Sequence, residues 1–466
     1  MSDASKHWNA ASIRSGPASS TEPPTEPLRP LQRIAGRAVP AVRGGTREIV
    51  EPARGAVLAV VPEGTAEDAA AAVAAARQAF DAGPWPRLHA QERARVLHRA
   101  AALIEEHSEE LARLETWDTG KTLPESRDDM AQVAEAFHYF GSLVATRGGE
   151  VNPVQAEALS LTLHEPIGVA ALITPWNYPL PALVAGPDVD MVSFTGGIVT
   201  GRAIAKAAAD TAKRVALELG GKNPNIVFED ADVDAALDHA LNAVFYHAGQ
   251  VCSAGSRLLV QEGLYERLVT GILERAAAIR LGFGWEDGTE MGPLVSEQHR
   301  AKVEGMIALA LDEGATLRLG GGRPDGDRFR SGTFLQPTVL TEVRREMRIA
   351  HEEIFGPVLT VERFESEQDA IEAANGTRTG LAAAVWTRDV AKAVRVGRAL
   401  RFGTVWLNDF HPYYPQAPWG GMKESGVGRE LGLTGLREYQ EEKHLYLNLD
   451  VRPVGWFGRS QGTTED

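Results

Sequence analysis

Two kinds of apolar spacing follow each other in the first part of the chain. The run 56–62 is short, almost wholly apolar and ended by a proline, which is typical of a strand. From Thr65 to Phe80 apolar residues recur every three or four positions behind an acidic first turn, which predicts a helix. Further long helices are predicted near residues 90–115 and 127–145.

From Ile167 onward the pattern changes to short apolar runs that turn residues separate. Strands alternating with helices are the signature of an α/β fold with a largely parallel sheet. A last run, 444–449, alternates cleanly and predicts a half-exposed strand to which another subunit can pair. The other predicted strands are residues 167–173, 191–194, 225–228 and 257–260, and the helical patterns between most of them are residues 201–212, 233–248 and 265–280.

The composition is that of an acidic globular protein. In 466 residues there are 48 Lys and Arg against 63 Asp and Glu, a net charge of −15. Nucleic-acid affinity depends on clustered cations, so we expect no nucleic-acid partner. The apolar share of 44% is large enough for a core, and the length predicts two or three domains of roughly 150 residues each. Residues 1–30, rich in Ser, Pro, Thr and Glu, are predicted to be a disordered tail.

The sequence shows neither an export signal nor a membrane span. No apolar signal core of about 7 to 15 residues stands at the N-terminus, and no run of about 18 apolar residues occurs anywhere. Cys252 is the single cysteine, which excludes an intramolecular disulfide and fits a reducing compartment. We therefore expect a cytoplasmic protein.

Motifs for metal, serine and ordinary dinucleotide chemistry are missing from the sequence. It contains no CxxC and no HExxH, so no metal site is expected. It contains no GxSxG, which disfavours a serine triad, and no GxGxxG, so a nucleotide site here must be built differently from that of an ordinary Rossmann unit.

Cys252 is the remaining candidate for chemistry. A lone cysteine is more often an inert buried residue than a nucleophile. A reactive thiolate needs a base and donors for the developing oxyanion. Glu218, in an otherwise apolar strand-like stretch, is a candidate base, and the alternative is an ordinary strand-end acid paired with Lys222. Asn177, between two prolines, is a candidate oxyanion donor or a turn-forming residue.

Six motifs in register resemble the aldehyde dehydrogenase superfamily, over about residues 35 to 450. Within the family, residues 406–413 (WLNDFHPY) are most similar to betaine-aldehyde dehydrogenases. The six motifs are PWNYP at residues 175–179, SFTGG at 193–197, LELGGK at 217–222, GQVCS at 249–253, EEIFGP at 352–357 and PWGGMKESG at 418–426.

The resemblance implies the chemical role of each candidate. Cys252 is the nucleophile that attacks an aldehyde to give a thiohemiacetal, and hydride then leaves to NAD or NADP. Glu218 activates the water that hydrolyses the resulting thioester. Asn177 and the backbone N–H of Cys252 hold the oxyanion. Glu430 matches a second acid that some members use as a proton relay.

The resemblance also implies the cofactor and substrate contacts. Glu353 matches the ligand of the nicotinamide ribose, with Phe355 packed beside it, and the N–H groups of the loop 195–197 make a plausible pyrophosphate site. Aromatic faces bind trimethylammonium groups. Phe140, Tyr246 and Trp419 match positions that line the substrate tunnel of betaine-type members, or they are simply tunnel or core packing. The other implied cofactor contacts are Trp176, Thr195, Gly196, Gly197 and Leu219.

One segment departs from the family pattern. Only 17 positions separate Asn177 from Phe194, where about 55 residues relative to the family are absent, which exceeds a βαβ unit of ~30 residues. The absent segment includes a central strand and the Lys-Pro-Ser-Glu motif that holds the adenosine ribose. Removing such a strand exposes apolar faces of its neighbours, so we expect a destabilised or rearranged cofactor domain. Losing the contacts to the adenosine side, which is remote from the reacting end of the cofactor, removes binding energy. We therefore expect weak NAD or NADP binding.

We therefore expect an aldehyde dehydrogenase-like α/β fold that acts on a small-molecule aldehyde and forms a homo-dimer or homo-tetramer. The alternatives are a cofactor-deficient, non-catalytic oligomerising subunit and a residual Cys252-dependent esterase. The expected organisation is a disordered tail at 1–30, a truncated Rossmann-type cofactor domain at 31–219 that is shortened between 180 and 187, an α/β catalytic domain at 220–424, and oligomerisation segments at 150–164 and 436–452.

Overall fold

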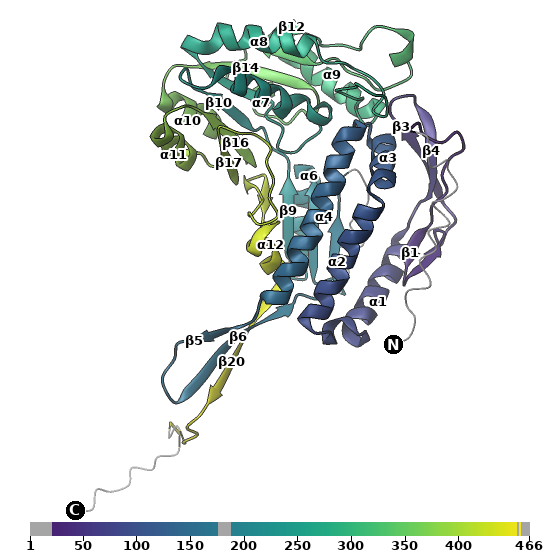
Figure 1. The fold of residues 1–466 in the computed structure, drawn as a ribbon. Coiled ribbons are helices and arrows are strands. Elements are labelled where there is room, and N and C mark those ends of the chain that lie inside the picture. Colours follow the sequence, from purple (N-terminus) through teal and green to yellow (C-terminus); the bar gives the residue numbers. More distant parts are fainter. Residues whose placement is uncertain (1–20, 176–187, 454–455, 458–466) are drawn as a thin grey trace, which may run out of the picture.

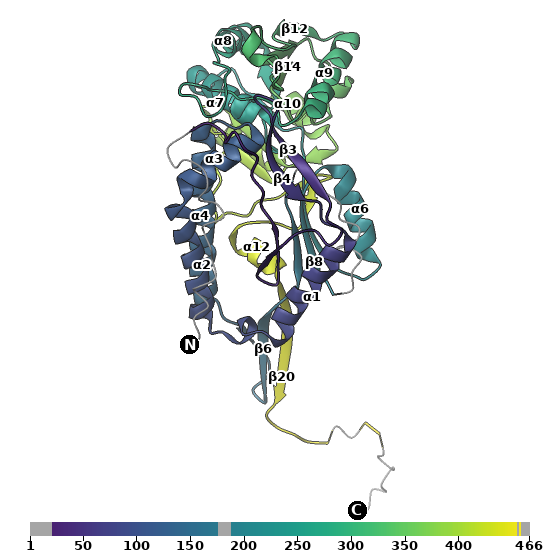
Figure 2. The ribbon, with the colours of Figure 1, turned by 90° about the vertical axis from the view of Figure 1, so that its right-hand side faces the viewer.

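The computed structural model describes residues 21–175, 188–453 and 456–457. Its N-terminal part consists of two small antiparallel hairpins followed by long helices, of which α2 and α4 run side by side (Figures 1 and 2). The helix predicted from Thr65 is present with Thr65 as its N-cap. These elements are β1 (Gln32–Ile34), β2 (Arg37–Val39), β3 (Thr46–Glu51), β4 (Ala56–Pro62), α1 (Ala66–Ala82), α2 (Ala90–Glu106), α3 (Ser108–Thr119) and α4 (Leu123–Thr146).

Two expectations for this part differ from the structure. The helical stretch predicted near 90–115 is two helices, because the backbone leaves helical geometry at His107. Residues 21–30 were predicted to belong to the disordered tail, yet Leu28 is hydrogen-bonded to β4. Its N–H donates to the carbonyl oxygen of Leu58 (2.9 Å), and its carbonyl oxygen accepts from the N–H of Val60 (2.8 Å). These bonds give Leu28 the backbone partners that a residue of a disordered tail lacks.

A four-stranded sheet follows, in the order β19-β9-β8-β7. Its three longer strands are parallel, and Val192, Phe194 and Leu217 pack on Ile204 of the covering helix. β7 is the edge of this sheet, and the side chain of Leu172 at its centre is 66% exposed. The elements are β7 (Ala170–Ile173), β8 (Met191–Gly196), α6 (Ile198–Ala209), β9 (Arg214–Leu219) and the antiparallel β19 (Gly426–Val427).

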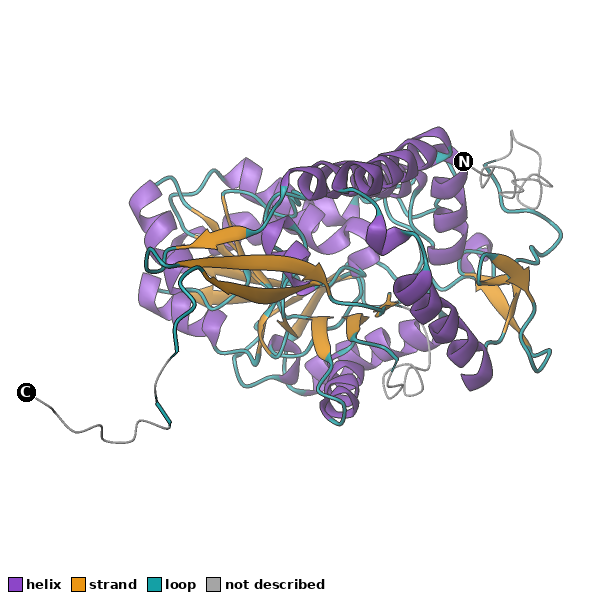
Figure 3. Cartoon of the chain, turned by 90° about the horizontal axis from the view of Figure 1, so that it is seen from below, coloured by secondary structure: helices purple, strands orange, loops and turns teal. Residues whose placement is uncertain are grey.

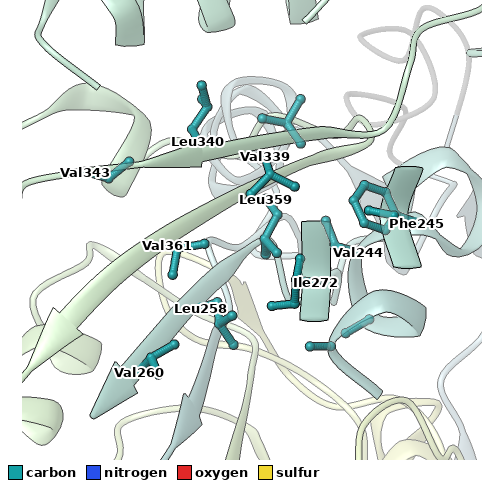
Figure 4. Close-up of a cluster of buried hydrophobic side chains, with 14 of the residues drawn as sticks. Val244, Phe245, Leu258, Val260, Ile272, Val339, Leu340, Val343, Leu359 and Val361 are labelled. Carbon is teal, nitrogen blue, oxygen red and sulfur yellow. The ribbon is translucent and has the colours of Figure 1, made fainter. Parts of the chain in front are cut away.

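The largest sheet has seven strands in the order β12-β13-β14-β11-β10-β16-β17, all parallel except β12. Helices cover both faces, so its central strands are buried and largely apolar. The charged residues Arg257 and Glu362 on neighbouring strands are buried as an ion pair. Figure 4 shows Leu258, Val260 and Leu359 from the strands packed toward Val244 and Ile272 from the helices. The strands are β10 (Pro224–Val227), β11 (Arg257–Gln261), β12 (Thr316–Leu319), β13 (Thr338–Thr341), β14 (Val358–Phe364), β16 (Ala382–Trp386) and β17 (Thr404–Leu407). The helices are α7 (Val233–Phe245), α8 (Tyr265–Ala277), α9 (Glu297–Asp312), α10 (Glu367–Asn375) and α11 (Val390–Ala399).

A C-terminal segment joins the two large sheets. The hydroxyl of Ser425 donates to the carbonyl oxygen of Gly220 (2.9 Å) and accepts from the N–H of Gly380 (2.8 Å). The Leu219 N–H donates to the carbonyl oxygen of Ser425 (2.8 Å). The carboxyl ends of β8 and β9 are thereby held against the seven-stranded sheet. The remaining small elements here are β15 (Thr379–Gly380), β18 (Met422–Lys423) and α12 (Gly432–Glu438).

A three-stranded arm projects from the body of the molecule (Figures 1 and 2). Its strands are β5 (Glu150–Asn152), β6 (Ala158–Pro166) and β20 (Gln440–Asn448), and β20 pairs with β6 along nine residues of register. Seen from below, helices flank the sheets of the body (Figure 3). The α/β class predicted from the alternating elements is confirmed. Within the described ranges, none of the helices combines the length and apolar character that crossing a bilayer requires.

Candidate active site

Cys252 lies in the loop that leads from α7 into β11, and its side chain is half-buried. The side-chain amide of Asn223 donates to the carbonyl oxygens of Cys252 (2.9 Å) and Ala254 (3.1 Å) and accepts from the N–H of Ala382 (3.0 Å). The hydroxyl groups of Ser253 and Tyr413 are hydrogen-bonded to each other. The cysteine is therefore fixed by contacts on both sides of its loop.

Burial and two carboxylates set the protonation state of the thiol. Burial, then the charges of Glu353 and Glu218, raise the pKa of Cys252 to about 12, while the N–H groups of Ser253 and Cys252 itself oppose the shift. The charges of both carboxyl groups therefore act on the thiol. At neutral pH the thiol is protonated, so it requires a proton acceptor to act as a nucleophile.

Glu218 is a buried base beside this thiol. It lies on β9 opposite Gly426 of β19, it is 7% exposed, and neither of its carboxylate oxygens has a hydrogen-bond partner. Burial and then the charge of Glu430 raise its pKa to about 8, against the opposing effect of Arg429. A carboxylate with a pKa near neutrality suits general-base catalysis.

The alternative of a Glu218–Lys222 ion pair does not occur. Both residues lie within the described part of the chain, and the Lys222 ammonium, fully buried, also has no hydrogen-bond partner there. Burial and then the charge of Arg257 lower the pKa of Lys222 to about 7. Glu218 is therefore not neutralised by its neighbour in sequence.

Glu430 is the charged residue that raises the Glu218 pKa. Its carboxylate accepts a hydrogen bond from the hydroxyl of Ser193 (3.0 Å), and its backbone exchanges two bonds of 2.7 Å with Trp419. Burial raises its pKa. Two acids with raised pKa values are thus close together between the two large sheets.

Glu353 lies against the glycine pair that follows β9. Its carboxylate accepts the N–H of Gly221, and a Cβ on Gly220 would lie 1.9 Å from its Oε2 atom. Burial raises its pKa to about 7. Its Oε1 atom is buried without a hydrogen-bond partner, which leaves an acceptor for a hydroxyl group of a ligand. Phe355 nearby has a φ of 61° and packs its ring on His299.

The end of β8 leads directly into the N-terminus of α6. Thr195 and Gly196 are paired with Glu218 and Leu219 of β9, and Gly197 is the N-cap of the helix. A Cβ on Gly197 would meet no atom within 4 Å, so the first N–H groups of α6 adjoin open space. A helix N-terminus of this kind binds phosphate.

These features fit one end of a dinucleotide better than the other. The unpartnered Glu353 oxygen suits a ribose hydroxyl, and the α6 N-terminus suits a pyrophosphate. On the far side of β8, however, the sheet ends at β7 with Leu172 exposed. Residues 176–187, which follow this strand, lie outside the described residues, and destabilisation by the shortened segment stays a prediction.

Aromatic side chains surround the cysteine loop. The ring of Tyr413 is 4.8 Å from that of Trp419 and 6.4 Å from that of His411, which in turn is 6.3 Å from the ring of Tyr246. Trp406 stacks on Trp419 at 6.2 Å. Burial lowers the pKa of His411 to about 4, so this imidazole is neutral at neutral pH.

Phe140 is not part of this aromatic group. Its only ring contact within the described ranges is with Tyr139, at 5.1 Å. Along α4 it lies eleven residues beyond Asp129, which faces Tyr246, and this separation is about 16 Å of helix. The structure therefore brings together Tyr246 and Trp419 of the three predicted substrate residues and leaves Phe140 apart, because Phe140 is too far along the helix.

The same pocket has an acidic wall. Burial and then the charges of Asp129, Glu125, Asp128 and Glu115 raise the pKa of Tyr246 above its usual range. These four residues come from α3 and α4, and their negative charges act on Tyr246. The Lys121 ammonium pairs with two of them, Glu115 (2.7 Å) and Asp129, and offsets part of this charge. Together the aromatic faces and the carboxylates favour a cationic ligand.

Asn177 and Trp176, predicted to contact the oxyanion and the phosphates, lie outside the described residues. The sequence analysis did not single out Asn223, Tyr413 or His411. Only the aromatic density of residues 406–413 pointed to the latter two, and Asn223 gave no signal beyond its position after the glycine pair.

The chain matches the aldehyde dehydrogenase family over residues 40–185 and 180–445. It is 46% identical to betaine aldehyde dehydrogenase from Bacillus subtilis, over 91% of this chain and 98% of that protein, and 40% identical to aminoaldehyde dehydrogenase 2 from Zea mays, over 88% and 93%. Betaine aldehyde dehydrogenase from Staphylococcus aureus, solved in complex with NAD+, superposes with a TM-score of 0.90 at 44% identity, over 92% of this chain and 97% of that one.

The alignment also measures the shortened segment. The alignment with the Bacillus subtilis protein extends over 483 positions. Of the 466 residues of this chain 91%, about 424, are aligned, so about 59 aligned positions have no residue in this chain. The two family matches meet at residues 180–185. Both observations agree in size and place with the segment that the sequence analysis found absent.

Proposed function

The chain belongs to the aldehyde dehydrogenase family, and from this premise we propose that it oxidises a quaternary-ammonium aldehyde of the betaine aldehyde type to its carboxylic acid with NAD+. The observation that carries the proposed substrate class is the aromatic group around Tyr413 and Trp419 with the acidic wall behind Tyr246. The names of the similar proteins from Bacillus subtilis and Staphylococcus aureus support the same class.

In the proposed reaction Cys252 attacks the aldehyde carbon. Glu218 accepts the thiol proton, because its charge acts on the thiol and its carboxylate oxygens have no hydrogen-bond partner among the described residues. The backbone N–H of Cys252 and the side-chain amide of Asn177 stabilise the oxyanion of the thiohemiacetal. Bound NAD+ supplies the hydride acceptor.

Hydrolysis of the thioester completes the reaction. The proton taken from the thiol first leaves Glu218, which is again ionised and then removes a proton from the attacking water. The C–S bond breaks, the carboxylic acid leaves, and Cys252 takes this second proton back from Glu218. Glu430, close to Glu218, passes the surplus proton toward solvent. Both steps use groups on the described chain whose pKa values are already raised toward neutrality.

For the cofactor, Glu353 would hold the nicotinamide ribose, and Phe355 and Leu219 would also contact the cofactor. The loop Thr195, Gly196, Gly197 would hold the pyrophosphate together with Trp176. For the adenosine side, residues 21–175 and 188–453 offer the exposed edge at β7. We propose NAD+ in preference to NADP+ and an affinity weakened by the shortened segment.

The projecting arm supports a homo-oligomer. Its strand β20 is exposed along its length, and Leu445 and Leu447 on it are 50% and 52% exposed. A long edge strand with exposed apolar side chains pairs readily with a second chain. We propose that the segments 150–164 and 436–452 assemble a dimer or tetramer and that the protein is cytoplasmic.

A matched pair of aldehydes tests the substrate class. Betaine aldehyde and its neutral isostere 3,3-dimethylbutanal differ only by the charged nitrogen, so the ratio of their kcat/KM values, followed as NADH absorbance, measures the effect of charge. A desolvated cation–π contact of about 2 kcal/mol corresponds to a ratio of roughly thirty. A ratio near one would overturn the proposed specificity, and Cys252→Ala should abolish turnover of both.

Calorimetric titration with NAD+ and then NADP+ tests the cofactor. Binding with turnover that Cys252→Ala abolishes supports the dehydrogenase. Folded, correctly assembled protein with no binding up to millimolar cofactor would favour the non-catalytic subunit. Ester hydrolysis that requires Cys252 but no NAD+ would single out the esterase, because acyl transfer through a thioester needs no hydride acceptor.

A further inference from the structure

A left-handed turn lies immediately before the cysteine loop. His247, Ala248 and Gly249 have φ values of 49°, 51° and 71°, three positive angles in succession. Residues with a Cβ rarely adopt this conformation. At Gly249 a Cβ would also lie 2.2 Å from the carbonyl oxygen of Gly356. Such a turn persists only where the surrounding structure holds it, and Cys252 follows it by three residues.

Gln250 holds the carbonyl side of this turn. Its backbone and side-chain N–H groups donate to the carbonyl oxygen of His247, at 3.0 and 3.2 Å, and its side-chain oxygen accepts the N–H of Val295 at 2.8 Å. These bonds leave the first N–H of the turn, that of His247, to be satisfied from elsewhere.

Glu125 provides that partner from a distant part of the chain. Its Oε1 atom accepts the N–H of His247 at 2.7 Å across 122 residues, and its Oε2 atom accepts the N–H of Thr122 at 2.7 Å. Both Glu125 and His247 are buried. Successive N–H groups of a left-handed turn form a concavity that favours an anion, so a carboxylate suits this position.

Capping the helix does not by itself require a glutamate here. At the same position of α1 the shorter Asp68 accepts the N–H of Thr65 at 2.9 Å and completes the capping box. In α4 the longer side chain caps the helix with one oxygen and reaches the His247 N–H with the other. The extra methylene therefore connects the helix to the cysteine loop.

We propose that Glu125 is a positioning residue for the nucleophile: by holding the His247 N–H it maintains the left-handed turn and thereby the placement of the Cys252 sulfur. This inference rests on the proposed role of Cys252. Glu125 acts on the nucleophile through the turn, and its charge, which also acts on Tyr246, is retained when the residue is changed to aspartate.

Glu125→Asp separates the two tasks of the side chain. An aspartate retains the helix cap, as Asp68 does in α1, but lacks the reach to His247. Because Cys252 is the only cysteine, the rate of iodoacetamide uptake reports its placement directly. We expect the alkylation rate and kcat to fall about tenfold or more, with KM for the aldehyde changed less than about twofold.

Glu51→Asp is the matched control. Glu51 is also a buried carboxylate that accepts two backbone N–H groups, those of Ala53 and Arg54, but it lies in the β3–β4 hairpin. The Glu51→Asp substitution should leave the alkylation rate of Cys252 and kcat unchanged. Wild-type alkylation and kcat in folded Glu125→Asp would overturn the proposal, as would an equal loss in the control.

Ala248→Gly tests the turn without altering the helix. Glycine adopts positive φ without steric conflict, so the turn then depends less on the carboxylate. In this background Glu125→Asp should lower the alkylation rate by less than about threefold, and an undiminished loss would overturn the proposal. Alkylation needs no cofactor, so an inactive wild-type protein that keeps this pattern would refute the proposed oxidation but not the positioning role.

Discussion

The side-chain amide of Asn223 donates a hydrogen bond of 2.9 Å to the carbonyl oxygen of Cys252. Asn223 follows Glu218 by five residues, at the point where the chain passes from the four-stranded to the seven-stranded sheet. One short segment therefore carries the proposed base at one end and a support of the nucleophile loop at the other. The relative placement of the two groups depends on this segment.

Asn223→Ala should lower both stability and activity. It leaves the carbonyl oxygens of Cys252 and Ala254 and the N–H of Ala382 without partners, and each buried unsatisfied group costs about 1–3 kcal/mol. We expect kcat to fall more than about tenfold because the loop loses its support. Asn375→Ala is the control, since Asn375 also bridges two backbone groups but near the surface. Equal losses of kcat in both variants would contradict the prediction.

Turnover should fall as the pH drops through about 8. Glu218 must be ionised to act as a base, and burial and the charge of Glu430 raise its pKa to about that value. In the wild type, kcat measured between pH 6 and 9.5 should show this fall toward low pH. The residual kcat of Glu218→Gln should not fall in this way. A limb that persists in the variant would assign the titration to another group.

Glu218→Gln should also raise the melting temperature more at pH 9 than at pH 5. A folded-state pKa above the ordinary value of 4.5 means that the folded protein binds the proton more tightly than the unfolded chain. Stability from this group is therefore present below pH 4.5 and lost as the pH rises through about 8. Glutamine does not ionise and avoids that loss. Glu266→Gln, at an exposed carboxylate, is the control for general charge removal and should show no such increase.

Replacing Leu445 and Leu447 by glutamate should dissociate the proposed oligomer. Both side chains lie on the exposed strand of the arm, and burying a carboxylate in a subunit interface is unfavourable unless it is paired. Light scattering after size-exclusion chromatography should show a shift toward monomer. Val390→Glu, at an exposed position of α11, should leave the mass unchanged. A monomeric wild type would contradict this prediction at once.

Leu172→Lys should reduce aggregation without loss of stability. Leu172 lies at the centre of the edge strand β7 and is 66% exposed, so it offers an apolar edge to other chains. Charged residues on edge strands oppose such pairing. The onset temperature of static light scattering should rise while the unfolding midpoint stays the same. Val394→Lys on α11 is the control, and an equal gain there would show a general effect of charge.

The alternation of apolar runs and helical spacing was sufficient for the α/β class and for most elements. The predicted strands 191–194 and 225–228 correspond to β8 and β10, since periodicity reports which side of an element is buried. The motifs around Cys252 and Glu218 predicted the family, which is confirmed. The roles of the individual site residues and the domain boundaries stay predictions.

Tertiary structure alone decided which side chains share a site. Glu125 and His247 are 122 residues apart, and Tyr413 reaches Ser253 across 160, so no local pattern reveals either contact. Phe140 matched an aromatic position in sequence but lies too far along α4. Local spacing was sufficient for most elements, and the motifs, through their resemblance to a known family, predicted the family and the shortened segment. Sheet order determined the contacts, because it sets which distant loops meet at the carboxyl ends of the strands.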